Sequence, residues 1–142
     1  MSSNAKYTVR VYALIVNDQN EILVSDESYS GLNFTKFPGG GMEWGEGTLN
    51  TLKRELLEEI DLRVETCEHF YTTDFFVPSF FDSTVQVISI YYKVNEGLAG
   101  DTIHNQSQDE HVKGFRWIPL KTLNQDQVTF PIDKHVVKLL TS

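Results

Sequence analysis

Three glutamates with helical spacing are the clearest candidates for chemistry in this 142-residue sequence. Glu55, Glu58 and Glu59 lie within a segment whose leucines recur every three or four residues, so the three carboxylates share one side of a predicted helix. Neighbouring carboxylates repel one another, and a hard cation such as Mg²⁺, which prefers oxygen ligands, would relieve that repulsion. The spacing therefore indicates a metal site, with a solvated acidic helix face as the alternative.

A glycine-rich turn, Pro38-Gly39-Gly40-Gly41, precedes the acidic segment. Glycines permit close backbone approach, so this turn can lie against the glutamates and offer a carbonyl oxygen as a further ligand. We expect the helix itself to begin near Thr48, which would act as its N-cap, and its apolar face to continue to Ile60.

The spacing of these residues resembles a known motif. Gly40, Glu46 and the run from Arg54 to Leu62 are similar to the Nudix box, Gly-x5-Glu-x7-Arg-Glu-U-x-Glu-Glu-x-Gly-U, where U is a bulky aliphatic residue. Every defined position matches except one, where Asp61 stands in place of glycine. Asp tolerates the left-handed conformation that helix ends often need, so we expect Asp61 to keep the cap at a small cost in stability.

The resemblance implies an α/β fold, a Nudix-type α/β/α sandwich with a mixed β-sheet. It also implies a pyrophosphohydrolase that uses Mg²⁺, or Mn²⁺ as a substitute, to cleave a nucleoside diphosphate linked to another group. By similarity, Glu55, Glu58 and Glu59 would be catalytic metal ligands, and the Gly39 carbonyl oxygen would assist them.

Further roles follow from the same resemblance. Glu46 and Arg54 match the family's structural ion pair, although an ordinary surface pair of small energy is the alternative. An additional acidic residue often completes the site, and Glu110 is the candidate, with Asp109 second. The general base stays open between a box glutamate, a loop acid and His111.

Substrate choice must come from outside the motif. A proline sixteen residues after Leu62 resembles the ADP-ribose pyrophosphatase subgroup, and this favours ADP-ribose or a nucleotide sugar. Aromatic rings surround that proline and could form a stacking wall for a nucleobase, unless they serve as core or dimer contacts. The substrate-binding candidates are Phe75, Phe76, Pro78, Phe80 and Phe81.

Two other functions compete with this one. A MutT-like nucleoside triphosphate pyrophosphohydrolase, including one acting on oxidised nucleotides, is the alternative within the family. A non-catalytic Nudix module that senses a ligand or binds a protein is the alternative of another class, and the presence of all four box glutamates disfavours it.

Alternating and helical patterns outline the remaining elements. We expect a single domain over residues 1–142, with residues 1–6 flexible and 95–108 forming a mobile surface loop. Strands are expected at Tyr7–Val16, Glu21–Ser25, Leu62–Val77, Val85–Val94 and Val112–Ile118, with a second helix at about Ile132–Leu140.

Composition narrows the partners. The net charge of −8 argues against tight binding to duplex nucleic acid or an anionic membrane surface. The single cysteine, Cys67, excludes an internal disulfide and suits a reducing compartment, and no signal or membrane segment is visible, so we expect a cytoplasmic protein. Exposed aromatic residues near Phe80 would permit a homodimer.

Overall fold

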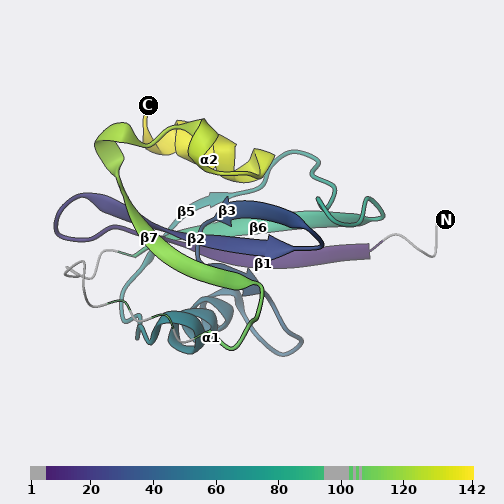
Figure 1. Cartoon of the computed structure of the whole chain (residues 1–142). Coiled ribbons are helices and arrows are strands. Elements are labelled where there is room, and N and C mark those ends of the chain that lie inside the picture. The colour runs from purple at the N-terminus through teal and green to yellow at the C-terminus, as the bar shows by residue number, and fades with distance from the viewer. Residues whose placement is uncertain (1–5, 95–102, 104, 106) are drawn as a thin grey trace.

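Two β-sheets lie between two helices in the computed structural model, which describes residues 6–94, 103, 105 and 107–142 (Figure 1). Helix α1 covers one side of the sheets and helix α2 the other, so the predicted α/β sandwich is confirmed. The expected flexibility of residues 1–5 falls outside the described residues, as does most of the expected loop at 95–108. Lys6, also expected to be flexible, is instead the first residue of strand β1.

The first sheet is mixed, as the resemblance implied. Its strands run in the order β4-β1-β6-β5, with β1 and β6 parallel and the other neighbours antiparallel. The second sheet is antiparallel and has the order β3-β2-β7. The strands of the first sheet are β1 (Lys6–Ile15), β4 (Gly39–Gly41), β5 (Glu68–Thr72) and β6 (Val85–Val94). Those of the second are β2 (Glu21–Tyr29), β3 (Leu32–Lys36) and β7 (Val112–Pro119).

Strand β1 separates two hydrophobic cores because successive side chains of a strand point to opposite faces. Tyr12 and Leu14 join the core under α2 (Pro131–Leu140), whereas Val11, Ala13 and Ile15 join the core under α1 (Thr48–Ile60). A strand covered on both faces is apolar almost throughout, which explains the unbroken hydrophobic run in the sequence. Each helix adds its own apolar stripe: Leu52, Leu56 and Ile60 from α1, and Ile132, Val136 and Val137 from α2.

Helix α1 differs slightly from the prediction at its start. The N-cap is Gly47, not Thr48, and the Asn50 side chain accepts a hydrogen bond from the Gly47 N–H at 2.9 Å. Thr48 begins the helix, and its hydroxyl bonds the Tyr92 hydroxyl at 2.7 Å. The left-handed cap expected at Asp61 is confirmed, because this residue has φ 53° and its N–H bonds the Leu56 carbonyl.

The predicted strand Leu62–Val77 is wrong over most of its length, because only β5 within it is regular. Leu62 and Val64 are buried while Arg63 and Glu65 are exposed, so the burial alternates like that of a strand. No described strand pairs with these residues, which carry the chain from α1 to the edge of the first sheet. Cys67 lies just before β5, half-buried against the core under α1, and not on a strand as expected.

Short 3₁₀ turns at Leu120–Thr122 and Gln125–Gln127 connect β7 to α2. In the described part of the chain, no helix is long and apolar enough to span a membrane.

Candidate active site

Arg54 joins the loop before α1 to the acidic face of the helix. Its Nε and Nη2 donate to the two carboxylate oxygens of Glu46 at 2.6 and 2.9 Å, and Nη2 also donates to the Gly41 carbonyl at 3.1 Å. Its Nη1 lies 3.1 Å from Glu55 Oε1 and 3.5 Å from Glu58 Oε2. The guanidinium and nearby backbone N–H donors lower the pKa of Glu46 to about 2, so this carboxylate is ionised at neutral pH.

The glycine turn lies directly against the acidic helix. A Cβ on Gly40 would come within 2.4 Å of Glu55 Oε1, so only glycine leaves that carboxylate in place. Gly39 has φ 142°, and a Cβ there would lie 2.1 Å from the Val11 carbonyl. Gly40 therefore brings the turn's backbone against Glu55, as the sequence predicted, and Gly39 brings it against strand β1.

Glu59 is half-buried, and one of its carboxylate oxygens is shielded from solvent. Its Oε2 has no hydrogen-bond partner among the described residues. Burial, with smaller contributions from Glu55 and Glu27, raises the pKa of Glu59 well above its usual range, although Lys36 opposes the shift. An orphaned carboxylate oxygen of this kind is where a bound cation would supply the missing partner.

The donor set of the three glutamates fits a hard cation in kind, since all its atoms are oxygens. As the side chains stand, no three His, Cys, Asp or Glu residues of the described chain lie close enough to hold a metal. Glu55 and Glu58 each contact the guanidinium of Arg54 through one carboxylate oxygen.

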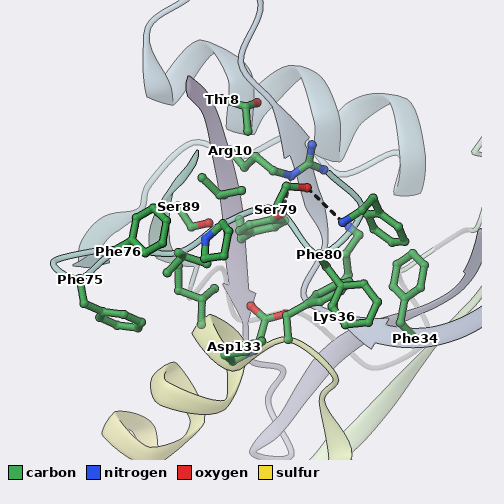
Figure 2. A pocket seen from close by; sticks show the side chains of 18 of the residues that line it. Thr8, Arg10, Phe34, Lys36, Phe75, Phe76, Ser79, Phe80, Ser89 and Asp133 are labelled. Atoms are coloured by element: carbon green, nitrogen blue, oxygen red, sulfur yellow. Dashed lines mark hydrogen bonds between the residues drawn. The ribbon is translucent and has the colours of Figure 1, made fainter. Parts of the chain in front are cut away.

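A cavity of about 540 Å³ opens between the two sheets and the start of α2. The structure places all the predicted substrate-binding residues on its wall: Phe75, Phe76, Pro78, Phe80 and Phe81. Their segment, which links β5 to β6, packs by ring contacts on Phe34 of β3 and on Phe130 before α2. Figure 2 shows Phe75 and Phe76 toward one side of the cavity and Phe34 and Phe80 toward the other.

Four charged residues of the cavity wall were not predicted from the sequence: Arg10, Glu27, Lys36 and Asp133. Lys36 is buried, with Nζ 3.0 Å from Glu27 Oε2 and 3.2 Å from the Phe37 carbonyl oxygen. One signal was available, because Arg10 falls at an inward position of an otherwise apolar strand. Sequence reasoning did not use it.

Asp133 lies at the α2 end of the cavity and accepts a 2.5 Å hydrogen bond from the Tyr91 hydroxyl. Burial raises the pKa of Asp133 to about 6, although the Tyr91 hydroxyl and the positive charges of Lys36 and Arg10 work against this shift. The carboxylate thus changes charge close to neutral pH.

The candidates before β7 lie apart from these contacts. Glu110 and Asp109 are exposed, and Asp109 accepts a hydrogen bond from the His111 N–H at 2.9 Å. His111 packs edge-on against Tyr29, and its Nδ1 lies 3.2 Å from the Ser28 carbonyl oxygen. Among the described residues, no hydrogen bond or ion pair joins Glu110 to α1, so its catalytic role stays a prediction.

The other histidines have structural surroundings where they can be described. His69 bonds the Thr72 hydroxyl at 2.7 Å, and His135 packs against the rings of Tyr71 and Phe75. His104 lies outside the described residues.

Comparison with solved structures shows close similarity of fold. A MutT structure, from work on the proteins of Aliivibrio salmonicida and Vibrio cholerae, is 27% identical, with a TM-score of 0.71 over 96% of this chain and 98% of that one. MutT of Methanosarcina mazei Go1 has a TM-score of 0.77 at 19% identity, covering 98% of this chain and 96% of that one. The E. coli dihydroneopterin triphosphate pyrophosphohydrolase has a TM-score of 0.73 at 14% identity, covering 94% and 96%.

A search of curated proteins found no match. The family model of the NUDIX domain matches residues 6–140, which is nearly the whole chain and includes both the acidic helix and the cavity. The chain therefore belongs to the Nudix family.

Proposed function

We propose that this Nudix enzyme is a Mg²⁺-dependent pyrophosphohydrolase that cleaves the diphosphate of a nucleoside diphosphate linked to another group. One observation carries the proposal: an aromatic cavity adjoins the acidic helix, which carries Glu55, Glu58 and Glu59, while the fourth box glutamate, Glu46, is retained in the loop before it. The cavity's cations interact electrostatically with that helix, Arg10 with Glu55 and Lys36 with Glu59.

Glu55, Glu58 and Glu59 would hold the metal, assisted by the Gly39 carbonyl oxygen. Bound Mg²⁺ would neutralise the diphosphate, orient it and acidify a water molecule. Arg54 keeps the carboxylates of Glu55 and Glu58 together before the metal arrives, and Glu46 keeps Arg54 in place. A box glutamate or Glu110 would accept the proton of the attacking water.

The cavity would take the nucleoside. Phe75, Phe76, Phe80 and Phe81 offer faces on which a base can stack, and stacking of this kind tolerates every base. The Asp133 carboxylate offers an acceptor to a base N–H group at the α2 end.

Two substrate classes remain in competition. The position of Pro78 on the cavity wall, at the spacing noted in the sequence, favours ADP-ribose or a nucleotide sugar. The 27% identity to MutT favours a nucleoside triphosphate.

A substrate panel tests the proposal. Purified protein is incubated with ADP-ribose, nucleotide sugars, dinucleoside polyphosphates, and normal and oxidised nucleoside triphosphates, in Mg²⁺, Mn²⁺ or EDTA, and products are separated by chromatography. Release of AMP from ADP-ribose that EDTA abolishes supports the first class, and turnover of triphosphates alone supports the second. Absence of turnover across the panel, from folded protein, contradicts the proposed function.

A further inference from the structure

Arg10 is a partly buried cation on the cavity wall that forms no ion pair among the described residues. The ion pairs found among the described residues involve Lys36, Arg54 and Arg116, and none involves Arg10. Its one described hydrogen bond runs from Nε to the Tyr12 hydroxyl at 2.6 Å, and its guanidinium carbon lies 5.7 Å from the centre of that ring. Removing such a charge from water is costly unless an anion compensates it.

Arg10 lies between the cavity and the acidic helix. Arg10 is paired in register with Gly41 on the neighbouring strand β4. A Cβ added to Gly41 would lie 3.6 Å from Arg10 Nη1. In Figure 2, Arg10 lies toward one end of the cavity and Asp133 toward the other, beside α2. A nucleotide with its base among the aromatic rings and its diphosphate at α1 would therefore pass Arg10 at the junction.

Lys36, the other cavity cation, is already engaged. Its ammonium is paired with Glu27 and bonds the carbonyl oxygens of Phe37 and Gly39, at 3.2 and 3.5 Å. Within the described part of the chain Arg10 donates only through Nε, so both terminal nitrogens are left to donate. A guanidinium with two such donors matches the geometry of a phosphate and binds it in a bidentate manner.

We propose that Arg10 is a specificity residue that binds the phosphate group adjoining the nucleoside, and that Tyr12 orients its guanidinium. This inference rests on the proposed function. It predicts that the site distinguishes a nucleoside monophosphate from the free nucleoside through Arg10, even without metal.

The test compares Arg10→Met, Arg10→Lys and wild-type protein. Binding of AMP and adenosine, and of GMP and guanosine, is measured by calorimetry in EDTA. We expect Arg10→Met to weaken binding of the preferred monophosphate at least tenfold and to change binding of its nucleoside less than twofold. Arg10→Lys should be intermediate, because it keeps the charge and loses the bidentate geometry.

Arg116→Met is the matched control, since it removes an arginine that pairs with Asp26 outside this cavity. It should leave both affinities unchanged. In turnover assays with Mg²⁺, Arg10→Met should raise KM about tenfold with a smaller effect on kcat, whereas a purely structural role would lower the melting temperature and weaken both ligands equally.

Three outcomes separate the possibilities. If Arg10→Met weakens nucleoside and monophosphate equally, or weakens neither, while the wild type hydrolyses a nucleotide, the role of Arg10 is contradicted and the proposed function stands. If the wild type neither binds nor hydrolyses any member of the panel, both are contradicted. A selective loss of monophosphate binding supports the inference.

Discussion

The guanidinium of Arg54 binds both carboxylate oxygens of Glu46, with N–O distances of 2.6 and 2.9 Å. This fork-to-fork geometry spans eight residues of sequence and fixes the loop before α1 against the second turn of the helix. Because the same guanidinium reaches Glu55 and Glu58, the orientation of the candidate metal ligands depends on the Glu46 contact.

Replacing Glu46 by Gln should reduce kcat about tenfold, the lower end of the effect of losing a group that orients metal ligands. It should also change the acid sensitivity of the fold. The pKa of Glu46 is about 2 when folded and 4.5 in its ordinary state, so its stabilising contribution is complete above pH 4.5 and is lost as pH falls toward 2. Thermal unfolding measured from pH 7 down to pH 2 tests this. The difference in melting temperature between wild type and Glu46→Gln should shrink as the pH falls from 4.5 toward 2. A difference in melting temperature that stays constant across this pH range would contradict the prediction.

Substituting Gly40 by Ala should impair metal binding without unfolding the protein. The added Cβ would lie 2.4 Å from Glu55 Oε1, the end of a side chain that can rotate away. Displacement of that carboxylate should raise the Mg²⁺ concentration for half-maximal activity about tenfold or more. Gly114→Ala is the control, because nothing lies within 4 Å of a Cβ there. Equal Mg²⁺ dependence in the two variants would show that Glu55 is not a ligand.

Glu58→Gln should lower kcat by about 100-fold, the scale seen when a group that stabilises transition-state charge is lost. Glu58 is exposed, with 60% of its side-chain surface accessible, so the melting temperature should change little. Glu68→Gln, at an exposed site on β5, should retain full activity. Near-normal turnover by Glu58→Gln would remove Glu58 from the metal site.

Asp133→Asn should change how stability depends on pH. The pKa of Asp133 is about 6 when folded and 3.8 in its ordinary state, so the folded protein binds a proton more tightly than the unfolded chain. Stability contributed by the protonated form is present below pH 3.8 and lost as pH rises through 6. Relative to wild type, Asp133→Asn should therefore gain about 2 kcal/mol of stability between pH 4 and pH 7.

Urea unfolding at a series of pH values measures that gain. Asp126→Asn, at an exposed position before α2, should follow the wild-type profile. If the stability of Asp133→Asn changed with pH in parallel with that of the wild type, the Asp133 carboxyl would not titrate between pH 4 and pH 7.

Phe80→Ala should raise KM for the preferred nucleotide by about tenfold, because base stacking on an aromatic ring contributes about 1–3 kcal/mol. Phe80 is 54% exposed and already contacts the rings of Phe81 and Phe130, which hold it at the cavity wall. Trp44→Ala removes a fully exposed aromatic residue outside the cavity and should leave KM unchanged. Equal KM values for both variants would place the base elsewhere.

The sequence predicted those parts of the protein whose signals are local. The helical spacing of the glutamates, the glycine turn and the left-handed Asp61 each depend on neighbours within a few residues, and all three lie as predicted. Local alternation of apolar residues also led to a wrong prediction of a strand. Leu62 and Val64 are buried in the core, but no described strand pairs with them.

The charged residues of the cavity wall could not be brought together by local sequence patterns. Arg10, Lys36 and Asp133 come from β1, β3 and the start of α2, and only the sheet topology brings them to one wall. The contact between Tyr91 and Asp133 joins residues 42 positions apart. Lys36 and Asp133 have ordinary neighbours in sequence, so no local pattern marks them, whereas Arg10 is marked only by its inward position on an apolar strand.

Strand β1 contributes its two faces to two different hydrophobic cores. The cavity and the acidic helix depend on different side chains of the scaffold, and the aromatic segment between β5 and β6 reaches the cavity without contributing to the core under α1. Exchanging residues 73–84 for the corresponding loop of a relative should therefore redirect substrate preference while leaving the hydrolytic machinery intact. The loop that lines the cavity can thus vary in sequence without altering the acidic helix.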